Sequence, residues 1–202
     1  KQAQSRLKAL ERMGEMGAAL NENVSPIRFP DPEKEAASPI IKLENAKAGY
    51  GKDAIILKDM DLRIDADDRI ALLGSNGNGK STFAKLIADR LSYVQGVIVR
   101  ADKLKIAMFA QHQLDDLHEN ENPIEHVRAL MKGAPEAKVR ARVAAMGLGR
   151  ERMETKAKNL SGGEKARLLL GLIAFHGPHL LILDEPTNHL DIDSRQMLVE
   201  AL

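Results

Sequence analysis

The sequence predicts an α/β fold in which antiparallel strands come first and strands then alternate with helices. Apolar and charged residues alternate over 41–44 and 59–64, as they do in strands with one buried face. The continuously apolar run 180–183 is typical of a strand that is buried on both faces of a parallel sheet. Segments with helical periodicity are inserted between these strands. This order of elements is typical of an α/β domain.

The chain is expected to consist of a linker over 1–38 and a domain over 39–202. Apolar positions at helical spacing predict an amphipathic helix over 1–20, and the prolines that follow predict an extended segment. The other elements expected in the domain are strands at 69–73, 97–99 and 106–109, and helices at 80–91, 124–132, 136–146, after Ser161 and at the C-terminal end.

Composition excludes several classes of protein. The chain has 202 residues, 44% of them hydrophobic, which is enough for a sizeable core. It has no cysteine, so disulfides, thiolate zinc sites and cysteine nucleophiles are excluded. The net charge of +1 points to neither DNA nor a membrane surface. No secretory signal or membrane-spanning run is present in the sequence, which favours the cytoplasm. Without an initiating Met, the chain is expected to be a piece of a larger protein.

The sharpest motif is a phosphate-binding loop between an expected strand and an expected helix. Its residues are Gly74, Ser75, Asn76, Gly77, Asn78, Gly79, Lys80 and Ser81, followed by Thr82. Glycines let backbone N–H groups converge on phosphate oxygens, and the helix start adds a positive dipole end. Lys80 is expected to reach the β- and γ-phosphates, and the Ser81 hydroxyl to ligate Mg²⁺. An ordinary glycine turn is the alternative.

Two acids follow the apolar strand at 180–183. Asp184 would lie at the carboxyl end of a parallel strand, where ligands bind in such sheets, and is expected to hold Mg²⁺. Glu185 is expected to act as the general base towards the attacking water. The alternative is a solvated turn, which the phosphate loop makes the weaker interpretation.

A further motif opens the helix after Leu160. Ser161 is expected as the N-cap and Glu164 as its partner in a capping box, with bare backbone at Gly162 and Gly163. The motif is explained either by a well-capped helix alone or by a second anion site for a γ-phosphate.

Taken in this order, these motifs resemble the ATP-binding-cassette (ABC) ATPase domain. Glu164 and the run Thr187-Asn188-His189-Leu190-Asp191 resemble the ABC-F subfamily, whose members are soluble proteins with two cassettes on one chain, many of them acting on ribosomes. The resemblance implies a phosphate-loop ABC fold with an antiparallel β subdomain, a mostly parallel core sheet and a helical subdomain. It also implies that 1–38 ends an inter-cassette linker and that 39–202 is a second cassette, incomplete at its C-terminal end.

The resemblance supplies roles that spacing alone does not. Tyr50 would stack on adenine, although a core tyrosine is the simpler explanation without the family. Gln111 would sense Mg²⁺ and the attacking water, and Asp191 would couple two composite sites. Residues 161–164 would contact ATP held by the opposite cassette, in trans. The switch histidine of the family is expected beyond Leu202, and His189 is not expected to replace it.

The function that follows is an ATP-driven clamp, in which bound ATP holds two cassettes together and ATP hydrolysis releases them. Its catalytic residues would be Glu185, Gln111 and Lys80. The partners would be a second cassette, on the same chain or in a homodimer, and the ribosome with its tRNA. The isolated chain is expected to be poorly active. Two alternatives are the nucleotide-binding domain of an ABC transporter and a module that binds ATP without hydrolysing it.

Two other groups of residues are given the simpler interpretation. Lys138, Arg140 and Arg142 form a basic helix face, expected to be solvated surface rather than an RNA contact. The histidines show no pair at helical H-x-x-x-H spacing and are expected not to bind metal. They are His112, His118, His126, His176, His179 and His189.

Overall fold

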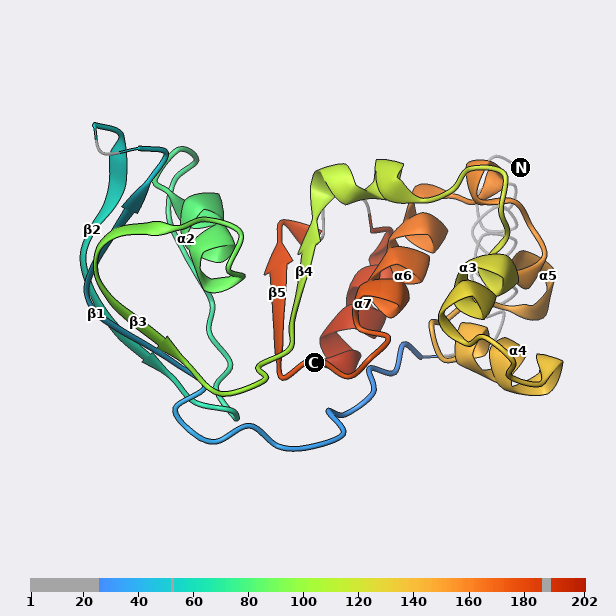
Figure 1. Ribbon diagram of the computed structural model, residues 1–202. Helices are drawn as coiled ribbons and strands as arrows, with labels where there is room; N and C mark the ends of the chain where they lie inside the picture. The colour runs from blue at the N-terminus through green and yellow to red at the C-terminus, as the bar shows by residue number, and fades with distance from the viewer. Residues whose placement is uncertain (1–25, 52, 187–189) are drawn as a thin grey trace, which may run out of the picture.

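The computed structural model describes residues 26–51, 53–186 and 190–202. The helix expected over 1–20 lies outside these residues. Residues 26–38 contain neither helix nor strand, as expected for an extended segment, and run along the lower side of the molecule in Figure 1. The segment is nevertheless tied to the domain, because Ile27 is buried and the Arg28 N–H donates to the Ala145 carbonyl at 2.8 Å.

The first lobe is built on a three-stranded antiparallel sheet with the strand order β2-β1-β3. Side chains alternate along the central strand, so Ile41 and Leu43 are buried whereas Lys42 and Glu44 are exposed, which confirms the alternation seen in the sequence. A helix packs on this sheet through Leu86. The elements are β1 (Ile41–Gly49), β2 (Ile55–Ile64), β3 (Tyr93–Arg100) and the helix α2 (Lys80–Ile87).

A second sheet consists of two parallel strands, β4 (Ile106–Ala110) and β5 (Leu180–Asp184), and confirms the parallel arrangement expected for the apolar run. Because successive side chains point to opposite faces, this sheet separates two cores. Met108 and Ile182 pack with Ala84 of α2 on one face. Phe109 and Leu183 pack into the core of the helical lobe on the other.

The helical lobe is held by one core and by capped helix starts. Asn122 is the N-cap of the first helix of this lobe. Its side-chain oxygen accepts the Glu125 N–H at 2.9 Å, and the Glu125 carboxylate accepts the Asn122 N–H at 2.7 Å. Val127 and Val139 are fully buried between the helices. The elements are η1 (Gln111–Asp116), α3 (Pro123–Leu130), α4 (Glu136–Ala144), α5 (Arg150–Met153), η2 (Ala157–Asn159), α6 (Gly162–Ile173) and α7 (Ile192–Ala201).

Several expected elements differ in their bounds from those observed, and the strand expected at 97–99 is longer, Tyr93–Arg100. The strand expected at 69–73 is coil, with Leu73 90% exposed, because it joins no strand of either sheet in the described part of the chain. The helix expected over 80–91 ends at Ile87, since Asp89 adopts a left-handed conformation (φ 59°). The short elements η1, η2 and α5 were not expected, and none of them has the length that makes helical periodicity visible.

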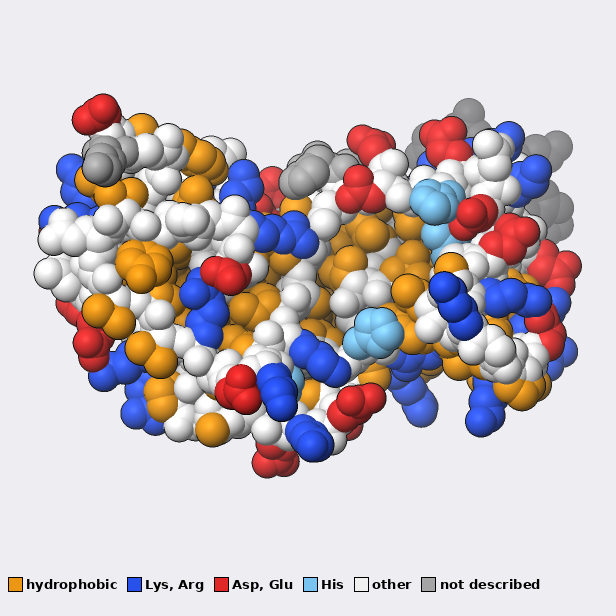
Figure 2. Space-filling model, viewed as in Figure 1, with side chains coloured by type: hydrophobic (Ala, Val, Ile, Leu, Met, Phe, Trp, Pro, Cys, Tyr) orange, Lys and Arg blue, Asp and Glu red, His pale blue; other side chains and the backbone are white. Residues whose placement is uncertain are grey.

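Two of the three basic residues on the face of α4 form contacts within the helical lobe. Arg140 forms ion pairs with Glu136 and Glu154, and Arg142 donates to the Phe175 carbonyl at 2.6 Å. Acidic and basic side chains are intermingled over the face of the molecule seen in Figure 2. Among the described residues, no helix combines the length and the apolar character that crossing a membrane requires.

Candidate functional site

The phosphate loop leads directly into α2 and depends on glycine for its shape. Gly77 and Gly79 have φ values of 86° and 85°, in the region that only glycine adopts easily. A Cβ on Gly79 would lie 3.0 Å from Ile56 Cγ2, so the loop also passes close to β2. Gly79 is the N-cap of α2 and provides no side-chain cap. The first N–H groups of the helix therefore retain their capacity to bind an anion.

The Lys80 side chain folds back over this loop. Its ammonium donates to the carbonyl oxygens of Gly74 and Ser75 at 2.8 and 3.0 Å. The loop thus presents a cation and helix N–H groups together, and this donor set fits a polyphosphate.

Tyr50 lies beside α2 and is the first residue of the loop that joins β1 to β2. It is 59% exposed, which is inconsistent with a core tyrosine. Lys85 of α2 donates to the Tyr50 hydroxyl at 3.4 Å, with its ammonium 5.8 Å from the ring centre. The hydrogen bond from Lys85, with a second from Thr82, lowers the pKa of the Tyr50 hydroxyl. An exposed aromatic ring thus flanks the helix that the phosphate loop begins.

The parallel sheet brings two expected site residues to one edge. Ala110 and Asp184 are paired as the last residues of β4 and β5, so Gln111 and Glu185 follow at the same edge. Glu185 is exposed and has a φ of 51°, at a sharp turn out of the strand. In Figure 1 this edge and the loop into α2 lie on the same, upper side of the molecule. The oxygen donors of Ser81 and Asp184 are of the type that Mg²⁺ prefers.

The start of α6 has the capping box that the sequence predicts. The Ser161 hydroxyl accepts the Glu164 N–H at 3.2 Å, and the Ser161 N–H donates to Glu164 Oε2 at 2.7 Å. Arg152 of α5 binds the other carboxylate oxygen at 2.9 Å. Arg152 was not singled out from the sequence, because no local pattern relates residues 152 and 164.

Asp191 lies against this capped turn. It is the N-cap of α7, where its Oδ1 accepts the Ser194 N–H at 2.8 Å. Hydrogen bonds from Ser194, together with the charge of Arg167, lower the pKa of the Asp191 carboxyl. A Cβ on Gly163 would lie 2.7 Å from Asp191 Oδ2. Residues 187–189 of the same motif lie outside the described residues.

The expected site residues therefore form two groups. In the first, Tyr50 contacts α2, which the phosphate loop begins; in the second, residues 161–164 lie against Asp191. Asp184 lies at the edge of the parallel sheet, and Gln111 and Glu185 follow at that edge. Helix α2 packs on one face of the β4–β5 sheet, whereas α6 packs in the core on the other. The helices that begin at the phosphate loop and at residues 161–164, α2 and α6, thus pack on opposite faces of this sheet.

Comparison with known proteins shows the family of this chain. The family described as ABC transporter matches residues 57–188. The chain is 46% identical over 202 residues to "Probable ATP-binding protein YheS" of Escherichia coli strain K12, covering 100% of this chain and 31% of that protein. It is 37% identical over 199 residues to "ABC transporter F family member 3" of Arabidopsis thaliana, covering 98% of this chain and 28% of that protein.

The fold also matches a solved structure. The chain superposes on the dimeric post-hydrolysis structure of the ATP-binding cassette MJ0796 bound to ADP and Pi, with a TM-score of 0.65. The identity is 22%, and 80% of each chain is covered, so this likeness shows the fold. The chain spans 31% and 28% of the length of the two curated relatives named above.

Proposed function

The chain belongs to the ABC transporter family, and from this premise we propose that it binds MgATP and hydrolyses the bond between the β- and γ-phosphates. The observation that carries the proposal is the glycine loop that ends in an uncapped helix start under the Lys80 ammonium. Three kinds of donor for a triphosphate, namely loop N–H groups, helix N–H groups and a lysine, are available in one segment. The exposed ring of Tyr50 beside α2 suits an adenine.

Each remaining residue has a role that its position supports. The oxygens of Ser81 and Asp184 would hold Mg²⁺, which neutralises phosphate charge when bound. Gln111 would orient the attacking water, and Glu185 would accept its proton. The water oxygen bonds to the γ-phosphorus as the bond to the β–γ bridging oxygen breaks, which yields ADP and phosphate.

We further propose that the working site needs a second cassette. Helix α6, which residues 161–164 begin, and helix α2, which the phosphate loop begins, pack on opposite faces of the β4–β5 sheet. This arrangement supports a contact of residues 161–164 with a nucleotide that another cassette holds. ATP would then close two cassettes on each other, and hydrolysis would release them. The second cassette would lie on the same longer chain or on a second copy.

A role on the ribosome, in the cytoplasm, is proposed from the resemblance to F family members alone. The basic face of α4 adds no support, since Arg140 and Arg142 are engaged within the lobe. Co-sedimentation with ribosomes of the Glu185→Gln variant of the longer protein, with and without ATP, tests it. Absence from the ribosome fractions in both conditions would instead favour another role, such as the energy module of a membrane transporter.

The nucleotide proposal is tested by titrating the chain with a fluorescent ATP analogue in Mg²⁺. Lys80→Ala should weaken binding about 10- to 100-fold, the effect of losing a hydrogen bond to a charged group. Lys138→Ala, which removes an exposed lysine on α4, should leave affinity unchanged. Equal affinity for the wild type and Lys80→Ala would contradict the proposal.

A further inference from the structure

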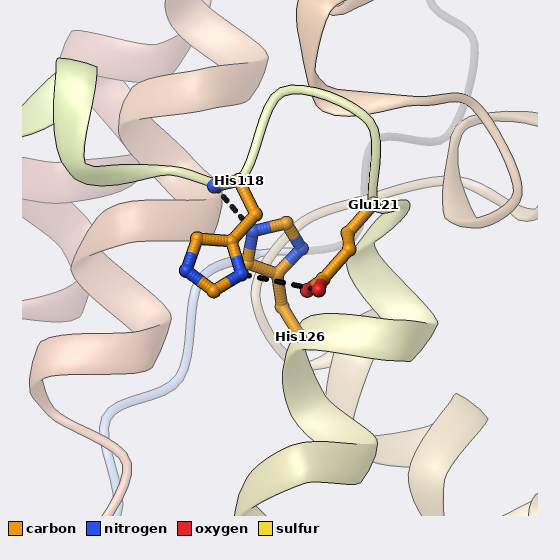
Figure 3. A group of neighbouring side chains, drawn as sticks. All are labelled: His118, Glu121 and His126. Atoms are coloured by element: carbon orange, nitrogen blue, oxygen red, sulfur yellow. Dashed lines mark hydrogen bonds and ion pairs between the residues drawn. The ribbon is translucent and has the colours of Figure 1, made fainter.

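Away from the nucleotide residues, two histidines and a glutamate come together at the entry to α3. Imidazole nitrogens of His118 and His126 and a carboxylate oxygen of Glu121 all lie within 4.8 Å of one another. Figure 3 shows the two rings and the carboxylate converging from the turn before α3 and from its first turn. This cluster was not predicted, because positions 118 and 126 are not at helical H-x-x-x-H spacing and a chain reversal brings them together.

His126 is held in the tautomer that a metal ligand requires. Its Nδ1 lies 2.9 Å from the Asn122 carbonyl oxygen, which can only accept, so Nδ1 carries the hydrogen. Its Nε2 is then the unprotonated nitrogen, and it accepts the backbone N–H of His118 at 3.1 Å. A histidine that donates one ring N–H to a backbone carbonyl and presents the other nitrogen as a lone pair has the arrangement found around metal ions.

The other two groups are accessible from solvent. His118 Nδ1 lies 3.1 Å from Glu121 Oε1, with side-chain exposures of 72% and 43%. The turn that carries them is braced, because the Ala157 N–H donates to the Glu121 carbonyl at 2.8 Å and the Lys158 N–H to the Glu119 carbonyl at 3.0 Å. The backbone that sets the spacing of the three side chains is therefore fixed from a second element, η2.

We propose that His118, Glu121 and His126 form a binding site for a divalent transition-metal ion of the zinc type. Two imidazole nitrogens and one carboxylate oxygen are a common zinc ligand set, and a fourth position remains for water. Mg²⁺ prefers oxygen ligands and is not expected there. When the metal binds, His126 Nε2 gives up its hydrogen bond from the His118 N–H and coordinates the ion instead. The ion then joins the turn that carries His118 and Glu121 to α3.

The site is tested by isothermal titration of the tag-free purified chain with Zn²⁺. Wild type should bind one Zn²⁺ per chain and should not respond to Mg²⁺. His118→Ala and Glu121→Gln, both at accessible positions, should each weaken Zn²⁺ binding at least tenfold. His176→Ala, which removes an exposed histidine elsewhere, should leave Zn²⁺ affinity unchanged. No Zn²⁺ binding by the wild type, or equal affinity in all four proteins, would overturn the proposal.

A second readout follows the exchanged hydrogen bond without relying on variants. In amide NMR spectra, Zn²⁺ should shift the His118 backbone N–H strongly, because that group loses Nε2 as its acceptor. An unmoved His118 amide at saturating Zn²⁺ would mean that the ion binds elsewhere and would overturn the assignment. Lys80→Ala should keep full Zn²⁺ affinity, which separates this site from the nucleotide proposal.

Discussion

Gly163 in the first turn of α6 lies directly against Asp191 at the start of α7, so close that a Cβ at 163 would be 2.7 Å from Asp191 Oδ2. The same added Cβ would be 3.1 Å from the hydroxyl of the fully buried Ser194. The backbone at the start of α6 thus packs directly against side chains at the start of α7, and no room remains between them for a methyl group. Close packing by itself therefore requires glycine at position 163.

Gly163→Ala should therefore destabilise the chain even though alanine favours helices. Overpacking of this kind costs roughly 1–3 kcal/mol, more than alanine gains over glycine in a helix. Urea denaturation followed by circular dichroism measures the loss. Gly149→Ala is the control, because a Cβ there meets nothing within 4 Å and should change stability by less than about 1 kcal/mol. An unchanged stability of Gly163→Ala would show that Asp191 moves aside freely.

The charge on Asp191 should make stability depend on pH in a defined direction. Its pKa is lowered in the folded chain by hydrogen bonds from Ser194 and by Arg167. A carboxyl with a lowered folded pKa stabilises the fold above its unfolded pKa of about 3.9 and loses that contribution as pH falls through the lower, folded value. Asp191→Asn keeps an N-cap acceptor but removes the charge.

Wild type should thus be more stable than Asp191→Asn at pH 7, and the difference should shrink as the pH falls below about 4. Urea midpoints of the two proteins across that range measure it. Asp67→Asn, at an exposed carboxyl on the β lobe, should differ little from wild type at either pH. A difference for Asp191→Asn that stays constant with pH would contradict the role of its charge.

Patterns that are complete within a short segment predicted structure well. Ser161 and Glu164 form the capping box that their spacing indicates, and the apolar run 180–183 is a parallel strand. Both depend on local chemistry, namely a side chain three residues from its backbone partner and a short run of apolar residues. The burial expected on both faces of the strand is not complete, because all five residues of β5 are half-buried. The same holds for the phosphate loop, whose positive-φ glycines are where the motif places them.

Features set by distant partners were not predictable from the sequence. The segment 69–73 is as apolar as a strand, yet it is coil because a strand also needs a neighbour with which to share hydrogen bonds. Arg142 looks like part of a surface face but lies against Phe175, 33 positions further along the chain.

Arg142 gives a test of whether the α4 basic face serves the fold. It donates to the Phe175 carbonyl at 2.6 Å, its guanidinium lies 4.7 Å from the Phe175 ring centre, and burial lowers its pKa. Arg142→Met keeps most of the apolar stem but leaves the carbonyl without its charged donor. The variant should lose about 1–3 kcal/mol of stability by urea denaturation. Lys138→Met on the same helix should lose less than about 0.5 kcal/mol; equal losses would contradict a structural role specific to Arg142.

The ion pair between Arg152 and Glu164 gives a test of how the capped turn of α6 is held. Glu164 is buried and uses one oxygen for the Ser161 N–H and the other for Arg152 Nε. Arg152→Ala leaves the capping box in place but removes the ion pair, and because Arg152 is half exposed the loss should stay within about 1 kcal/mol. Glu164→Ala removes both interactions and should cost more, about 1–3 kcal/mol.

Urea denaturation of both variants and of the double variant measures the coupling between Arg152 and Glu164. Since Arg152 has no capping role of its own, Arg152→Ala should cost nothing further in the Glu164→Ala background, and a full additional loss there would show that Arg152 stabilises the lobe through other contacts.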